Sequence, residues 1–137
     1  YHWLENLVGC KLQNAERIHP EWQLCLGHTL ELHPKVPGLP IVQLLPGRAL
    51  VAYGAPDAAA QKQGKPWAAV TWLLFVEPLG ARRCRFISRY RCATSADLPT
   101  RLSLGPTLLE PIGFAMDRRM LMGVKERAES VRNLCAD

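Results

Sequence analysis

The sequence predicts an α+β fold, in which a curved antiparallel β-sheet packs on a long C-terminal α-helix. Three observations support this prediction: strand-like segments fill the middle of the chain, Pro and Gly turns separate them, and one long amphipathic helix follows. Sequential strands followed by a single helix favour a helix on one face of the sheet. The length of 137 residues suits a single domain, 1–137.

The first two thirds of the chain are expected to be mainly strands. Residues 1–8 have the apolar spacing of a helix end, and residues 9–23 are expected to form a loop. Strands are then predicted at residues 24–33, 41–45, 48–53, 67–77 and 82–94. Pro46-Gly47 and Pro78-Leu79-Gly80 are expected turns, and residues 54–66 a loose loop. The last two strands would form a β-hairpin.

The clearest helix is expected over residues 111–134. Pro111 suits its first turn, where a missing N–H has no cost. Arg118, Lys125 and Glu129 fall on a polar side, and Lys125 and Glu129 can pair at a spacing of four residues. An apolar stripe runs along the helix, and its residues lie four apart: Ile112, Met116, Met120, Val124 and Ala128. Val131 and Cys135 extend this stripe toward the C-terminus.

Composition excludes several classes of protein. Apolar residues make up 48% of the chain and charged residues 21%, which is typical of a globular domain rather than a disordered one. The five cysteines form no CxxC motif, so neither a zinc framework nor a disulfide scaffold is expected. Scattered free thiols are typical of a reducing compartment, so a cytoplasmic location is expected. No signal peptide is predicted at the start, and the longest apolar run, 67–76, is too short to span a membrane.

Two long segments resemble a known superfamily. The stretches "TWLLFVEPLGARRCRFISRYRC" and "LLEPIGFAMDRRMLMGVKERAE" are similar to the C-terminal half of bacterial SRPBCC proteins, which include START lipid-transfer domains and polyketide cyclases. "YHWLENL" and "NAERIHPEWQLCLGHTLEL" extend the resemblance over nearly the whole chain. The matching residues are Trp72, Glu77, Pro78, Leu79, Arg85, Arg89, Arg91, Glu110, Pro111, Met116, Arg118, Met120, Leu121, Gly123, Lys125, Arg127, Ala128 and Glu129.

The resemblance implies a helix-grip fold, with a cavity between the concave sheet and the C-terminal helix. It implies binding of a hydrophobic or amphipathic small molecule in that cavity, as for lipid-binding members. Two departures matter. Gly27-His28 stands where the superfamily has Gly-Asp, and the superfamily's opening strand and helix have no counterpart before the Tyr-Trp segment. The exposed sheet edge would then need other cover, such as a second copy in a homodimer.

Candidate ligand-binding residues lie on the last strand and the helix. Alternation places Phe86, Ser88 and Tyr90 on one side of the strand and Arg89 and Arg91 on the other. We expect the first side to face inward, which leaves the arginines on a wet, convex face. The alternative places Arg89 or Arg91 in the cavity, where it could bind a carboxylate or phosphate. The candidate polar anchors are Tyr90, Arg89 and Arg91. The helix would contribute Ile112, Met116, Met120 and Val124, which could equally be ordinary core.

Two other functions stay open. A cyclase- or hydratase-like enzyme would need an inward-facing titratable group, for which Glu110, Asp117 and His28 are candidates, although Glu110 also suits a helix cap. No catalytic, metal or nucleotide motif occurs, so no catalytic residue, metal or cofactor is predicted. The other alternative is a protein-interaction module that uses the exposed sheet edge. The net charge of +5 comes without aromatic-interleaved basic runs, so no nucleic-acid role is expected.

Overall fold

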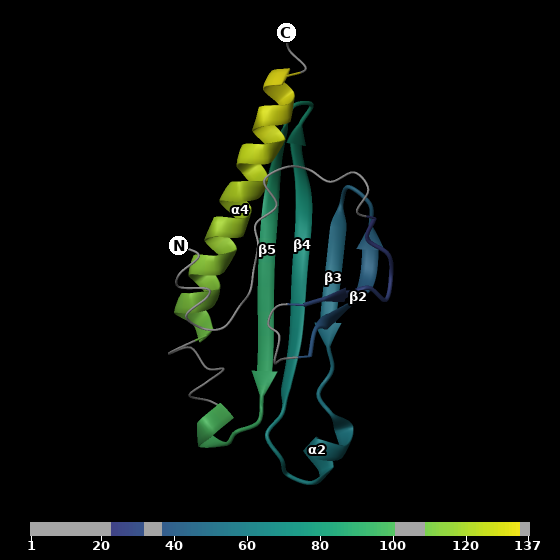
Figure 1. Ribbon diagram of the computed structural model, residues 1–137, viewed down its shortest axis with the longest axis vertical. Helices are drawn as coiled ribbons and strands as arrows, with labels where there is room; N and C mark the ends of the chain where they lie inside the picture. Colours follow the sequence, from purple (N-terminus) through teal and green to yellow (C-terminus); the bar gives the residue numbers. More distant parts are fainter. Residues whose placement is uncertain (1–22, 32–36, 101–108, 135–137) are drawn as a thin grey trace. The chain divides into compact units, whose positions relative to one another are not determined.

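A computed structural model describes residues 23–31, 37–100 and 109–134. It has a five-stranded antiparallel sheet and a long C-terminal helix, which confirms the α+β class (Figure 1). Two compact units can be distinguished within the described residues. One comprises the residues up to Gly54 together with Val70–Arg89, and the other comprises Ala55–Ala69 together with the residues from Tyr90 onward. The helix end expected at residues 1–8 lies outside the described residues.

The sheet has the order β1-β2-β3-β4-β5, so each strand pairs with its neighbour along the chain. Its strands are β1 (Thr29–Leu30), β2 (Leu39–Leu45), β3 (Ala49–Gly54), β4 (Ala68–Gly80) and β5 (Arg83–Thr94). The expected turn at Pro46-Gly47 is confirmed: the Arg48 N–H donates to the Leu45 carbonyl over 2.9 Å. Gly47 has φ +69°, which glycine adopts without a steric cost.

The first strand is shorter than predicted. Residues 24–33 were expected to be extended, but within the described part only Thr29–Leu30 pair with β2. Gly27 adopts φ +84° in a turn, and its N–H donates to the Ile41 carbonyl over 2.9 Å. The apolar residues before Gly27 therefore precede a turn, and Leu24 and Leu26 are exposed.

The fourth strand is longer than predicted and runs through the proline expected in a turn. The Val76 N–H donates to the Arg48 carbonyl over 2.8 Å, on the side of β4 that faces β3. Because every second backbone N–H of a strand points the same way, the missing N–H of Pro78 falls on that side too. The last β3 pair is Ala49 with Phe75, so no strand partner is lost at Pro78.

The segment 54–66 contains a short helix where a loose loop was expected. This helix, α2 (Ala58–Lys62), begins after Asp57, whose side chain accepts a hydrogen bond from the Ala59 N–H over 2.8 Å. Three consecutive alanines have high helix propensity, and Asp is a favoured N-cap. The combination of cap and alanines was a helix signal that the surrounding Pro and Gly residues obscured.

The hydrophobic core lies on one face of the sheet, which we call the core face. Its buried members are Leu39, Ile41, Leu50 and Ala52, with Leu30, Leu44, Val70, Trp72 and Leu74 packed against them. The register explains the grouping, since Leu50 pairs with Leu74 and Ala52 with Trp72. The opposite side, the outer face, carries the alternate pairs, including Ala49 with Phe75 and Tyr53 with Thr71.

The C-terminal helix α4 (Leu109–Leu134) is 26 residues long, about 39 Å at 1.5 Å per residue. Pro111 lies in its first turn and Lys125 pairs with Glu129 over 4.0 Å, as predicted. The predicted stripe is wrong at Ala128, which is exposed, whereas Arg127 is half-buried. The side chains of Val131 and Cys135, expected to extend the stripe, lie outside what the structure describes. A spacing of four residues drifts around a helix of 3.6 residues per turn, so the half-buried side shifts to Arg127.

Candidate functional site

One hydrogen bond shows which side of β5 continues the core face. The Trp72 Nε1–H donates to the Ser88 Oγ over 2.9 Å, and both residues are half-buried. Because Trp72 packs against the core of the sheet, Ser88 lies on the core face as well. Strand alternation then places Phe86 and Tyr90 on that face, the side on which both were predicted.

Tyr90 is the most exposed aromatic group on this side of β5. Its relative exposure is 42%, whereas Phe86 is half-buried. Partial burial raises the pKa of Tyr90 above its ordinary value, and the nearby Cys92 adds to this increase. The pKa of the Cys92 thiol is raised in turn by burial. Both groups are therefore neutral at neutral pH, and the Tyr90 phenol can donate or accept a hydrogen bond.

Burial changes across the core face from one side of the sheet to the other. On β2 and β3 the face is closed, with Ile41 only 1% exposed and Ala52 fully buried. On β4, Trp72 and Leu74 are half-buried, and on β5 the face ends at Ser88 and the exposed Tyr90. The buried apolar side chains of β2 and β3 are thus followed, on β5, by the hydroxyl groups of Ser88 and Tyr90, of which Tyr90 is exposed.

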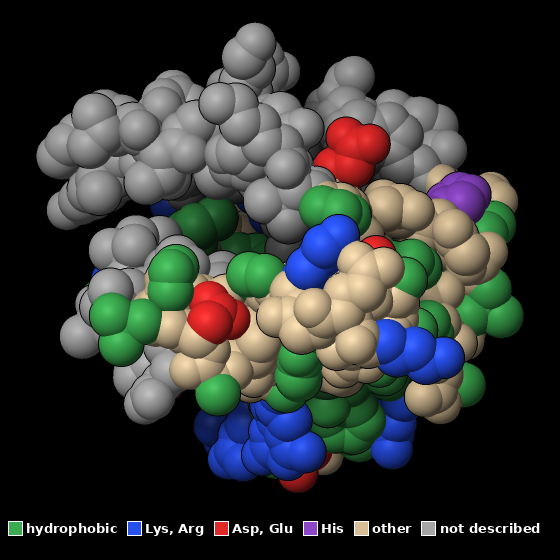
Figure 2. Space-filling model, turned by 90° about the horizontal axis from the view of Figure 1, so that it is seen from below, with side chains coloured by type: hydrophobic (Ala, Val, Ile, Leu, Met, Phe, Trp, Pro, Cys, Tyr) green, Lys and Arg blue, Asp and Glu red, His purple; other side chains and the backbone are tan. Residues whose placement is uncertain are grey.

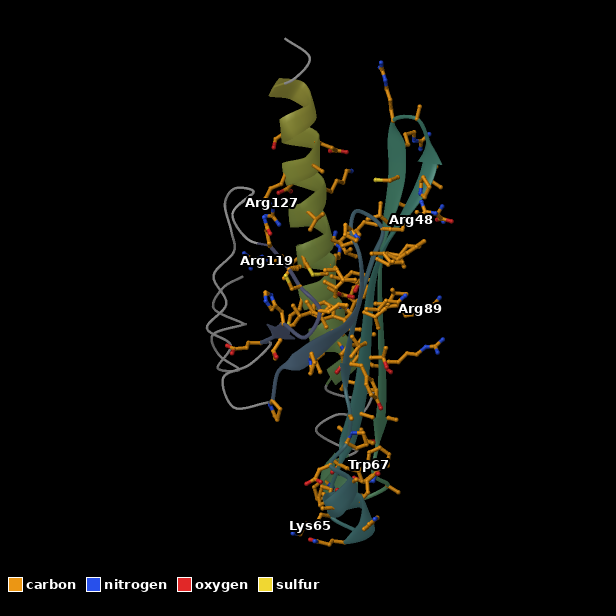
Figure 3. The ribbon with its side chains drawn as sticks, turned by 90° about the vertical axis from the view of Figure 1, so that its right-hand side faces the viewer. Arg48, Lys65, Trp67, Arg89, Arg119 and Arg127 are labelled. Atoms are coloured by element: carbon orange, nitrogen blue, oxygen red, sulfur yellow. The ribbon has the colours of Figure 1, made fainter. Side chains whose placement is uncertain are left out.

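The outer face carries arginines among hydrophobic side chains. Arg48 lies over the Phe75 ring at 5.9 Å from its centroid, and Arg85 Nη1 binds Glu77 Oε2 over 3.2 Å. Figure 3 shows Arg48 and Arg89 extending to the same side of the sheet. A similar mixture of cationic and hydrophobic side chains is visible along the lower edge of Figure 2.

The predicted arginine anchors are therefore separated from the other β5 candidates. Arg89 and Arg91 are exposed and alternate with Ser88 and Tyr90, so they belong to the opposite side of the strand. This is the arrangement that strand alternation favoured, with the arginines on the wet face; the alternative, with Arg89 or Arg91 on the same side as Tyr90, does not occur.

The helix candidates lie on the half-buried side of α4. Met116, Met120 and Val124 are all half-buried, while Phe114 and Met122 are exposed. The side chain of Ile112 lies outside what the structure describes. Methionine adapts to irregular apolar surroundings, so these positions suit either a core or a ligand-lining role.

The candidate acid–base groups occupy separate elements. His28 is exposed in the turn before β1, where its Nδ1 accepts a hydrogen bond from the Cys25 N–H over 3.4 Å. Glu110 is exposed in the first turn of α4, and Asp117 is half-buried on the same helix. Among the described residues, no three His, Cys, Asp or Glu side chains come together in a way that could hold a metal ion.

Sequence reasoning missed a polar network where the β4–β5 hairpin begins and ends. The Ser95 N–H donates to the Trp67 carbonyl over 3.0 Å, and the Trp67 N–H donates to Ser95 Oγ over 3.1 Å. Asp97 accepts hydrogen bonds from the Ser95 hydroxyl and, over 2.9 Å, from the Thr100 N–H. These bonds, Ser95 first, lower the pKa of Asp97 to about 2. Asp97 followed by Leu-Pro-Thr is an N-cap signal that could have revealed this network.

Comparisons of this chain with protein-family models, with curated proteins and with solved structures gave no match. In the part of the chain that the structure describes, no helix combines the length and apolar character needed to cross a bilayer.

Proposed function

We propose that this chain binds a hydrophobic or amphipathic small molecule at the β4–β5 side of the core face. The observation that supports this proposal most directly is the hydrogen bond between Trp72 and Ser88. It holds an aromatic ring on an apolar surface within the same strand pair that carries Tyr90. Apolar burial would supply most of the affinity, and the Tyr90 hydroxyl would orient the polar end of the ligand.

The ligand's polar end is expected to be neutral or weakly acidic. Tyr90 is a neutral hydroxyl, and the charged groups nearest to it in sequence, Arg89 and Arg91, extend from the other side of β5. A carbonyl or hydroxyl group fits such an anchor, because a phenol can both donate and accept. We therefore favour Tyr90 over Arg89 and Arg91 as the polar anchor.

The helix-grip arrangement of the SRPBCC superfamily is part of this proposal. In it, α4 would cover the core face, with Met116, Met120 and Val124 forming a second wall of a ligand cavity. The sequence resemblance and the half-buried state of these three residues support it. Nuclear Overhauser effects between the Met120 methyl group and the Trp72 indole would verify this arrangement. Their absence in an assigned spectrum would contradict it.

Binding can be tested with Nile red, an uncharged hydrophobic probe that carries a carbonyl group, followed by its fluorescence. Tyr90→Phe removes only the hydroxyl and should weaken probe affinity, by up to roughly tenfold for one lost hydrogen bond. Tyr53→Phe is a matched control, because Tyr53 is 40% exposed but lies on the outer face. Equal affinity for both variants would contradict the role of Tyr90, and a wild-type chain that binds no probe would contradict the site.

A second candidate function is protein interaction through the free edge of β5. This strand has 12 residues and lies at the edge of the sheet, so among the described strands it pairs with β4 alone. A long edge strand offers unpaired backbone groups to a partner chain, and a homodimer is the simplest case. Light scattering during size-exclusion chromatography would distinguish a monomer from a dimer. A monomer at all concentrations would exclude the homodimer.

A further inference from the structure

The β4–β5 hairpin extends beyond the rest of the sheet as a two-stranded ribbon, residues 77–85. The last residue pair between β3 and β4 is Ala49 with Phe75, and the final backbone contact is Val76 with Arg48. Figure 1 shows β4 and β5 continuing past the end of β3. Every residue from Pro78 to Arg85 is exposed. A two-stranded ribbon without a third strand gains little stability from burial, so its surface is available to another molecule.

Apolar and cationic side chains lie close together near the end of the ribbon. Leu79, in β4, is 47% exposed, and the turn that joins the two strands is Ala81-Arg82. Arg83 begins β5 directly after the turn, and Arg85 lies two residues further on. The one carboxylate within residues 77–85 is Glu77, which is bound by Arg85. Arg82 and Arg83 therefore give the end of the ribbon a positive charge beside an exposed leucine.

We propose that this ribbon docks on the surface of a membrane that contains anionic lipids. Arg82 and Arg83 would lie among the lipid headgroups, where each basic residue is attracted by the negative surface potential. Leu79 would enter the boundary between headgroups and acyl chains, because burial of its side chain is favourable there. The exposed Leu79 favours a lipid surface over nucleic acid, since phosphate contacts alone would not require an apolar side chain so close to Arg82 and Arg83. This proposal is independent of the ligand site on the core face.

The test is sedimentation of the full chain with vesicles of phosphatidylcholine, with and without phosphatidylserine. The wild-type chain should sediment with the anionic vesicles only. Arg82→Ala/Arg83→Ala should weaken this binding roughly 30-fold, and Leu79→Ser about tenfold. Because these side chains are exposed, all variants should keep the wild-type thermal unfolding midpoint, which circular dichroism verifies.

The matched control is Lys62→Ala/Lys65→Ala, which removes the same amount of charge from exposed positions in and just after α2. It should bind anionic vesicles within about twofold of the wild type, because it leaves the ribbon intact. Equal losses in the two double variants would overturn the proposal, since net charge alone would then explain binding. It would also be overturned if the chain bound duplex DNA through Arg82 and Arg83 but did not bind the vesicles.

Discussion

Trp72 and Ser88 are joined by a hydrogen bond of 2.9 Å between the indole nitrogen and the hydroxyl oxygen. This bond connects β4 to β5 on the face that contains the buried core. It places Ser88, and by alternation Tyr90, on the apolar side of the sheet, and it leaves Arg89 for the outer face. The proposed ligand site depends on this relationship.

The Trp72–Ser88 bond should contribute measurably to stability. Both residues are half-buried, and a hydrogen bond between neutral side chains contributes about 1 kcal/mol net. Trp72→Phe and Ser88→Ala should each lower the free energy of unfolding. A double-mutant cycle by urea denaturation should give a coupling of about 0.5–1.5 kcal/mol. Strict additivity of the two changes would show that the bond makes no contribution.

The core of the sheet should respond strongly to loss of volume at Ile41. Its side chain is 1% exposed, so Ile41→Ala should cost about 2–5 kcal/mol of unfolding free energy. Val42 is 52% exposed, beside the irregularity in β2, so Val42→Ala should cost under about 0.5 kcal/mol. Urea denaturation compares the two variants. Similar losses at both positions would contradict the assignment of the core face.

The ionisation of Asp97 should make the stability of the fold depend on pH in the acid range. Its pKa is about 2, below the ordinary 3.8, so its ionised form is stabilised by folding. The stabilisation from the ionised Asp97 is fully present at a pH above the ordinary pKa of 3.8, and it is lost as the pH falls through about 2. Asp97→Asn should therefore lower the thermal midpoint at neutral pH and flatten its decline between pH 4 and 2. If the thermal midpoints of the wild type and the variant fell in parallel over this range, Asp97 would not be the source of the pH dependence.

The ion pair between Arg85 and Glu77 should contribute little to stability. Its side chains are 62% and 40% exposed, so water screens the attraction. Glu77→Gln should change the free energy of unfolding by less than about 0.5 kcal/mol in urea denaturation. A loss above about 1.5 kcal/mol would indicate that the outer face at Arg85 is covered rather than open.

Patterns of local spacing predicted much of the fold. The hairpin, the turn at Pro46-Gly47 and the long helix follow from strand propensity, turn residues and apolar periodicity, all of which are local properties. The extent of β4 past Pro78 could not be predicted, because it depends on where β3 ends. The shortened β1 depends on a turn at Gly27 that is stabilised by a bond to the distant Ile41.

The candidate site was predictable in part for the same reason. Alternation along β5 separates Ser88 and Tyr90 from Arg89 and Arg91, but alternation alone does not indicate which side faces the core. The Trp72–Ser88 bond decides this, and it joins residues 16 apart in the sequence. The network of Trp67, Ser95 and Asp97 likewise joins distant segments, although its N-cap pattern is local.

We propose that the core face beside Trp72 and Tyr90 holds a small molecule. Native mass spectrometry of the purified chain, before and after denaturation, tests it most directly. We predict one bound molecule per chain in the wild type and a reduced fraction in Tyr90→Phe, with Tyr53→Phe unchanged. A wild-type chain that is empty as purified, and remains empty after incubation with fatty acids and with aromatic polyketides, would contradict the claim.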